Sequence, residues 1–328
     1  MNLNGKVIFD ANGNYVRALG DGDILITAAQ QRTSNEYNKM QKEIEKRKIR
    51  SKQQRGEDFI KQIVAEEYRG LLKGNNSGHA LELAVRITYK KGPKGGFLVM
   101  SNINGRKPAT YGDLRNIFGI HNGKPVDKKT VTNVVKKLEE IDFLWVTRSN
   151  DSTRKEGENY KGEIEENIYE INPKFFARGE TQDLQHAKIY LKNFAEWTKD
   201  LKPGEKGFLI EIIPYFHYDQ YVLCKNPHAN KAEERLEIFD RTSLAKELGQ
   251  NRDTVSDKVK RLKRCGILGE FDAFDVKSLY LHPDLVFKLD VGYENLDYTD
   301  KIRNQFEINM EEAKKQGKTY DLFDDLMD

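Results

Sequence analysis

The chain has 328 residues, enough for two domains of ordinary size with extensions. About 33% of the residues are charged, yet the net charge is only +3, so any basic surface must be local. Two cysteines are too few for a disulfide framework and are typical of a reducing compartment. No apolar run reaches transmembrane length, and the first residues, MNLNGKVIFD, lack the apolar core of a signal peptide. We therefore expect a cytoplasmic protein without a membrane partner.

The N-terminal part predicts a hairpin followed by a long helix. Residues 1–34 alternate apolar and polar side chains around Asn-Gly and Asp-Gly pairs, which is typical of a β-hairpin or meander. Residues 35–75 have a helical pattern whose basic first half, KEIEKRKIRSKQQR, is too polar to be buried. This half is either a DNA-contacting arm or a solvated helix. The second half should dock on a core through Phe59, Ile60, Ile63, Val64, Tyr68 and Leu71.

An internal repeat dominates the rest of the sequence. Residues 127–144, DKKTVTNVVKKLEEIDFL, align without a gap with residues 251–268, NRDTVSDKVKRLKRCGIL. Asp127 and Asn251 are suited to cap the two helices that follow. Both helices carry a stripe at helical spacing, formed by Val131, Val135 and Leu138 in one and by Val255, Val259 and Leu262 in the other. A pattern that occurs twice indicates a duplicated structural unit.

Each repeated helix has the neighbours that a winged helix requires. A shorter helix precedes it, with a capping box at Thr110 and Asp113 in one repeat and a left-handed stop at Gly249 in the other. Short strands follow and run into Pro173 or Pro283. A helix-turn-helix followed by a strand pair predicts a winged helix, although a helical hairpin in another kind of core has the same local pattern.

We therefore expect a mainly helical α+β fold with two tandem winged helix-turn-helix domains. The domains cover residues 76–180 and 204–290, with lead helices at 79–91 and 206–218. A linker helix at 181–203 joins them, and its stripe of Leu191, Phe194 and Trp197 suits a core or a homodimer interface. A helix and an acidic tail occupy residues 291–328.

The second helix of such a motif usually enters the major groove of DNA. In the first repeat its outer face is rich in lysine and includes Asn133, which can pair with adenine N6 and N7. In the second repeat, Asp253 and Asp257 oppose phosphates; they can accept from cytosine N4 or mark a protein-binding helix. We expect the first repeat to be the primary base reader. The expected DNA contacts are Lys128, Lys129, Thr132, Asn133, Lys136, Lys137, Arg148, Arg154, Lys155, Arg252, Ser256, Lys260 and Arg261.

Arg148, Arg154 and Lys155 belong to a predicted wing at 147–163, which either follows phosphates and the minor groove or is a mobile charged hairpin. Catalytic patterns are missing from the sequence, since GPKGG (92–96) lacks the spacing of a phosphate-binding loop. Cys224, His228, Cys265 and His282 have zinc-binding chemistry but no compact spacing. We expect no enzymatic activity, cofactor or metal.

The second repeat combines three features: a preceding segment KIYLKNFAEWTK, the TVSDKVKRL recognition helix and a closing LHPDLVF. In this combination it resembles the RepL-type winged-helix replication proteins of Gram-positive plasmids and related phage proteins. The resemblance rests on Thr254, Val255, Ser256, Val259, Leu262, Pro283, Asp284 and Leu285, and the first repeat has a matching set at Thr130, Val131, Thr132, Val135, Leu138 and Pro173.

The resemblance implies sequence-specific binding of double-stranded DNA for a phage or plasmid. The use is either replication, by origin binding, or transcription regulation, and the residues do not separate the two. The acidic tail, which ends in YDLFDDLMD, suits a replisome or RNA polymerase subunit, a fold-back onto the protein's own basic surface, or a frayed terminus without a role. The competing hypothesis is a protein-interaction scaffold with weak DNA affinity.

Overall fold

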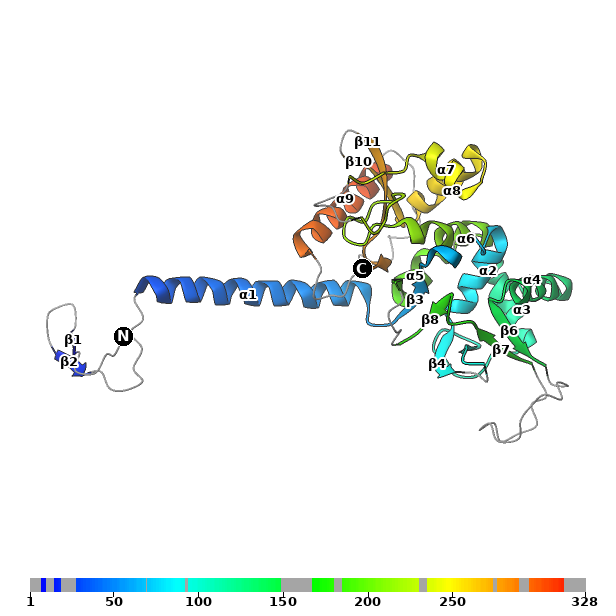
Figure 1. The fold of residues 1–328 in the computed structure, drawn as a ribbon, viewed down its shortest axis with the longest axis horizontal. Coiled ribbons are helices and arrows are strands. Elements are labelled where there is room, and N and C mark those ends of the chain that lie inside the picture. The colour runs from blue at the N-terminus through cyan, green and yellow to red at the C-terminus, as the bar shows by residue number, and fades with distance from the viewer. Residues whose placement is uncertain are drawn as a thin grey trace. The chain divides into compact units, whose positions relative to one another are not determined.

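The computed structural model describes residues 7–9, 15–18, 28–68, 70–91, 94–148, 167–179, 185–229, 235–273, 276–288 and 295–315. The chain forms a mixed α+β structure with more helix than strand (Figure 1). It divides into two units, residues 1–50 and residues 51–328, and helix α1 crosses the boundary between them.

The first unit contains the predicted hairpin, formed by strands β1 (Val7–Phe9) and β2 (Tyr15–Ala18) in antiparallel pairing. Helix α1 (Ala28–Arg55) follows, and its side chains from Arg32 to Arg50 are exposed apart from a few half-buried ones. Its polar composition explains this exposure. The prediction that the helix continues to residue 75 is wrong, because the chain leaves it at Gly56 with a φ of 81°. Glycine adopts that left-handed conformation without steric cost.

The second unit contains the remaining elements. Its α-helices are α2 (Gly74–Ala84), α3 (Tyr111–Gly119), α4 (Lys128–Glu140), α5 (Leu191–Trp197), α6 (Pro203–Ile212), α7 (Arg241–Leu248), α8 (Arg252–Arg264) and α9 (Leu296–Lys315). Three short 3-10 helices are η1 (Glu66–Tyr68), η2 (Ile120–Asn122) and η3 (Ile213–Tyr215). The strands are β3 (Phe59–Ile63), β4 (Ile87–Lys91), β5 (Phe97–Val99), β6 (Leu144–Thr147), β7 (Ile168–Ile171), β8 (Phe176–Ala177), β9 (His186–Tyr190), β10 (Leu268–Ala273), β11 (Val276–Leu281) and β12 (Val286–Phe287).

Two regions of this unit follow the sequence repeat. In the first repeat, residues 74–177, helices α2, α3 and α4 accompany an antiparallel sheet of order β4-β5-β7-β6. In the second repeat, residues 203–287, helices α6, α7 and α8 accompany the antiparallel pair β10-β11. The strand pairs that follow α4 and α8 lie where the sequence predicts them. The predicted lead helices are shorter than expected, since α2 gives way to β4 and α6 gives way to η3.

A four-stranded sheet of order β12-β9-β3-β8 joins the two repeats. Both of its central strands lie in segments predicted as helix, one in the long N-terminal helix and one in the linker helix. Ile60 of β3 and Ile189 of β9 are fully buried. Strand β3 reads FIKQI and β9 reads HAKIY, so each mixes polar and apolar residues over only five positions, too few for the period to separate a strand from a helix. The predicted homodimer stripe of the linker segment, Leu191, Phe194 and Trp197, lies in the core of the same chain.

One continuous hydrophobic core underlies both repeats and the joining sheet. It includes Leu81 and Val131 from the first repeat, Phe208 and Val255 from the second, and Ile189 from the sheet. The two repeats therefore share an interior within this unit instead of having separate ones.

The C-terminal helix is present, as predicted, and is fixed to the core by a buried ion pair. Arg303 of α9 donates to the Asp284 carboxylate at 2.6 Å, and the Ser51 hydroxyl accepts from the same guanidinium at 2.9 Å. Arg55, at the end of α1, donates to the carbonyl of Pro283 at 3.0 Å. The acidic tail lies outside the described residues.

Candidate nucleic-acid interface

The turn between α3 and α4 is fixed by hydrogen bonds at both ends. The predicted capping box opens α3, where the Thr110 hydroxyl accepts from the Asp113 N–H at 3.1 Å and the Asp113 carboxylate accepts from the Thr110 N–H at 2.9 Å. Arg115 then clamps the turn, because its Nε donates to the Val126 carbonyl at 2.9 Å and its own carbonyl accepts from the Val126 N–H at 3.0 Å. This clamp sets the direction in which α4 begins.

Asp127 caps α4, as predicted. Its carboxylate accepts from the Thr130 N–H at 2.9 Å and from the Thr130 hydroxyl at 2.6 Å. The pKa of Asp127 is lowered from its ordinary value, first by the Thr130 hydroxyl and then by the Thr130 N–H. The cap therefore stays ionised and keeps the first turn of α4 in place.

Helix α4 has one buried and one exposed face. The buried face consists of Val131, Val134, Val135 and Leu138. The exposed face carries four lysines and two neutral polar residues, Lys128, Lys129, Thr132, Asn133, Lys136 and Lys137. All six were predicted as DNA contacts from the position of the apolar stripe, and the structure brings them together on the solvent side of one helix.

The exposed cations of α4 are nearly free of acidic partners. Within the described part of the chain, Lys128, Lys129 and Lys137 have no ion pair, and Lys136 approaches Glu140 at 3.9 Å while its side chain remains 75% exposed. Surface pairs of this kind are weak. Free exposed ammonium groups can exchange their counterions for phosphates.

The sequence reasoning missed Tyr111, which braces the start of α4. Its hydroxyl donates to the Lys128 carbonyl at 2.8 Å and lies 3.1 Å from the Thr132 hydroxyl. Thr132 in turn donates to the Lys128 carbonyl at 3.0 Å, so its hydroxyl is already engaged by the protein. The only signal in the sequence is the position of Tyr111 directly after the Thr110 cap.

The predicted wing of the first repeat is described only at its base. Arg148 donates to the Glu139 carboxylate at 2.9 Å, so this expected DNA contact is paired with an acid of α4. Arg154 and Lys155 lie in the range 149–166, outside the described residues.

The second repeat shows the same local construction. Asp240 accepts from the Ser243 N–H at 2.6 Å and caps α7. Gly249 ends α7 in the left-handed conformation with a φ of 63°, as predicted. Asn251 caps α8 by accepting from the Asp253 N–H at 2.8 Å. The buried face of α8 is the predicted stripe of Val255, Val259 and Leu262.

The expected DNA contacts of α8 have different environments. Arg252 is exposed, and Ser256 is half-buried. Lys260 is exposed but pairs with Asp257 at 3.1 Å. Arg261 is turned toward the protein body, where it donates to the carbonyl of Asp200 at 3.2 Å and lies 3.8 Å from a carboxylate of α6. The available basic surface of α8 is therefore smaller than that of α4.

Other binding chemistry is sparse in the part of the chain that the structure describes. No group of three or more His, Cys, Asp and Glu side chains is placed to hold a metal ion there. Burial raises the pKa of Cys224 to about 12 and that of Cys265 to about 11, so both are protonated thiols at neutral pH. No described helix is both long and apolar enough to cross a bilayer.

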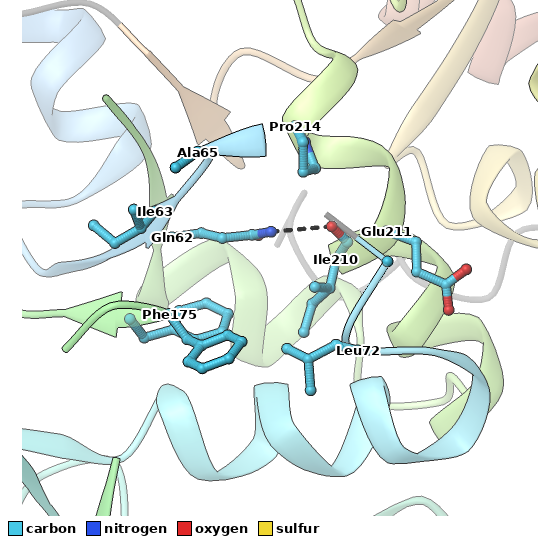
Figure 2. Close-up of a pocket in the computed structure, with 10 residues that line it drawn as sticks. Gln62, Ile63, Ala65, Leu72, Phe175, Ile210, Glu211 and Pro214 are labelled. Carbon is cyan, nitrogen blue, oxygen red and sulfur yellow. Dashed lines mark hydrogen bonds between the residues drawn. The ribbon is translucent and has the colours of Figure 1, made fainter. Parts of the chain in front are cut away.

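A small cavity lies between β3 and α6 (Figure 2). The Gln62 side chain spans it and donates to the Ile210 carbonyl at 3.0 Å, while Leu72, Phe175 and Pro214 contribute to its walls. Its volume of about 30 Å³ suits a water molecule and excludes an organic substrate. The outer face of α4 is the place where the structure brings most of the predicted contacts together. Comparisons of the chain with protein-family models, curated proteins and solved structures gave no match.

Proposed function

We propose that each repeat is a winged helix-turn-helix domain and that the chain binds specific sites in double-stranded DNA without catalysing a reaction. In the first domain, α2, α3 and α4 would be the three helices and β6 and β7 the base of the wing. In the second, α6, α7, α8 and the β10-β11 pair take the same roles. This order of elements supports a major-groove position for α4 and α8.

The observation that carries the proposal is the exposed face of α4. Free lysines supply the electrostatic attraction to phosphates, which dominates affinity for any duplex. Asn133, in the middle of this face, supplies a group that distinguishes adenine from other bases. The RepL-like motif supports a role for a phage or plasmid, with the chain at a replication origin or at promoters. Mapping the bound sites on the element that encodes the protein separates these two uses.

The salt dependence of binding tests the proposal. We expect the logarithm of the affinity for random duplex to fall linearly with the logarithm of salt concentration, with a slope of about −4 to −8. Replacing Lys128, Lys129 and Lys137 by Gln should make the slope shallower by about 3, since each phosphate contact contributes about 0.9. Replacing Lys192, Lys301 and Lys315, which are exposed on α5 and α9, by Gln is the matched control.

A salt response that is flat for the unmodified chain contradicts DNA binding. It would favour the second candidate, a protein-interaction scaffold, for which the aspartates on the outer face of α8 are the supporting observation. Equal changes of slope in the α4 variant and the control variant would contradict the position of the interface.

A further inference from the structure

The contact between α2 and α6 is reciprocal. A Cβ atom on Gly78, four residues after the first residue of α2, would lie 1.8 Å from the carbonyl oxygen of Pro203, the first residue of α6. A Cβ atom on Gly207, four residues after Pro203, would lie 2.1 Å from the carbonyl oxygen of Gly74, the first residue of α2. In each helix, the glycine four residues after the first residue therefore packs against the first residue of the other helix.

The joining sheet has the same reciprocity. Lys61 of β3 is opposite Lys188 of β9. On its other side Lys61 is opposite Ala177 of β8, and Lys188 is opposite Phe287 of β12. If β3 is exchanged with β9 and β8 with β12, the strand order β12-β9-β3-β8 is unchanged. A two-fold rotation produces pairings of this kind, as in an isologous homodimer. A single two-fold axis that relates both sets of contacts would pass between Lys61 and Lys188 and through the crossing of α2 and α6.

The two helix-turn-helix turns lie beside that crossing. In the first repeat, Ile120 and His121 of η2 line a small pocket together with Pro203 and Lys206 of α6. In the second, Gln250 donates to the carboxylate of Glu211, which also accepts from the first N–H of α2. Figure 1 shows the α3–α4 and α7–α8 pairs flanking α2 and α6. Both turns, from which α4 and α8 begin, therefore lie next to the crossing of α2 and α6.

We propose that one chain acts as an internal dimer that places α4 and α8 on two half-sites of the same duplex, arranged as an inverted repeat with unequal halves. This inference rests on the proposed DNA binding. A two-fold arrangement of recognition helices matches the two-fold symmetry of duplex DNA, which is why dimeric helix-turn-helix proteins bind inverted half-sites about one helical turn apart.

The unequal halves follow from the residues at matching positions of the two helices. Asn133 of α4 corresponds to Asp257 of α8, and Lys129 corresponds to Asp253. Asparagine pairs with adenine, whereas aspartate accepts from the N4 amino group of cytosine. The half-site under α8 should therefore contain cytosine where the half-site under α4 contains adenine.

The chemistry of the internal interface supports one chain per site. Its geometry is reciprocal, but its side chains have diverged, since Lys206 corresponds to Ser77. Lys206 pairs with Glu82, and Ser77 lies 3.4 Å from the carboxylate of Glu211. All of Ser77, Glu82 and Lys206 are less than 6% exposed, so this surface is already occupied inside the chain.

The test is selection of duplexes from a random library with the full chain, followed by footprinting and measurement of the mass of the complex. We expect two inverted half-sites with centres about 10 bp apart. We also expect one chain per duplex and at least a tenfold weaker affinity when either half-site is scrambled. Asn133→Ala should relax base preference in one half only, and Asp257→Ala in the other half only.

The outcomes separate this inference from the proposed function. Protection of a single half-site, two chains per duplex, or an unchanged selection with Asp257→Ala overturns the internal-dimer arrangement and leaves DNA binding intact. Failure to enrich any duplex, combined with a flat salt response, overturns DNA binding itself.

Discussion

Helices α4 and α8 have equivalent inner faces and different outer faces. Both bury the same valine and leucine stripe after a capped turn. Outside, α4 exposes four lysines against one glutamate, whereas α8 exposes Arg252, Lys260 and Arg264 against two aspartates. The inner face is constrained by close packing, because the loss of even one methylene group there lowers the stability of the fold. The outer face has no such constraint and can change. The repeats therefore preserve the way in which a helix is positioned while the groups it presents diverge.

The same contrast holds at the α2–α6 crossing, where the two repeats have the same backbone geometry but different side chains.

The largest expected effect on stability comes from disturbing this common backbone geometry. Gly78→Ala and Gly207→Ala should each destabilise the protein by more than about 4 kcal/mol, because the new methyl group meets a backbone carbonyl that cannot move without separating the helices. Urea denaturation measures the effect. Gly112→Ala, where the added Cβ finds its nearest atom at 3.5 Å, is the matched control and should not destabilise. Tolerance of either interface alanine would contradict the close crossing.

The next effect concerns the two glutamates at this crossing. Glu82 binds the buried cations Arg86 and Lys206, so Glu82→Ala should cost about 3 to 5 kcal/mol of folding free energy by leaving both charges unpaired. Glu211 is half-buried and accepts from the Gly74 N–H at 2.7 Å, so Glu211→Ala should cost only about 1 to 2 kcal/mol. If Glu82→Ala and Glu211→Ala lower the free energy of unfolding equally in the same denaturation experiment, the two glutamates contribute equally to the interface, against this prediction.

A third comparison uses pH, because His79 of α2 corresponds to Phe208 of α6. Burial lowers the pKa of His79 from 6.5 to about 4, with the Glu82 carboxylate acting against this shift. The unfolded chain therefore binds more protons than the folded chain between these values. The stabilisation from the neutral ring is complete above pH 6.5 and is lost as the pH falls toward 4, by up to about 3 kcal/mol.

His79→Phe should accordingly flatten the dependence of the unfolding free energy on pH in this window. His282, whose pKa burial also lowers to about 4, should maintain part of the slope. An unchanged pH profile in the variant would show that His79 is solvated.

The smallest effect separates base contacts from phosphate contacts on α4. Asn133→Ala should cost about 1 to 3 kcal/mol on the preferred site and little on random duplex, whereas Lys136→Ala should weaken binding to both. At the corresponding position of α8, Asp257→Ala should strengthen binding to random duplex slightly, because it removes a negative charge near phosphates. Competition binding at fixed salt measures all three. Equal losses on both DNAs for Asn133→Ala would remove it from base contact.

The sequence predicts the parts of this molecule that depend on local interactions. Caps at Thr110, Asp127 and Asn251 and the left-handed Gly249 need only neighbours within a few residues, and all four are confirmed. The sequence predicts helix for the segments that form β3 and β9, and this is wrong because the hydrogen-bond partners of both strands lie far along the chain. Each strand is five residues long and contains a lysine as well as apolar residues, so its own pattern is too short to distinguish a strand from a helix.

The candidate interface divides in the same way. Which side of α4 and α8 faces solvent follows from the apolar stripe and is confirmed by burial of that stripe. The stripe does not predict whether an individual cation lacks an acidic partner, because that partner can come from another element. Arg261 is bound by Asp200 and α6, and Arg148 by Glu139. Helical periodicity contains no information about these partners.

The order of strands in the joining sheet has a consequence for synthesis of the chain on the ribosome. Strand β3 emerges before the first repeat but needs β9, which is made only after that repeat is complete. The face of α2 that contains Gly74 and Gly78 likewise remains uncovered until α6 has been made. The first repeat therefore lacks its contact with α6 until residue 212, the end of α6, has left the exit tunnel. The joining sheet is completed later still, when β12 (Val286–Phe287) has been made and can pair with β9.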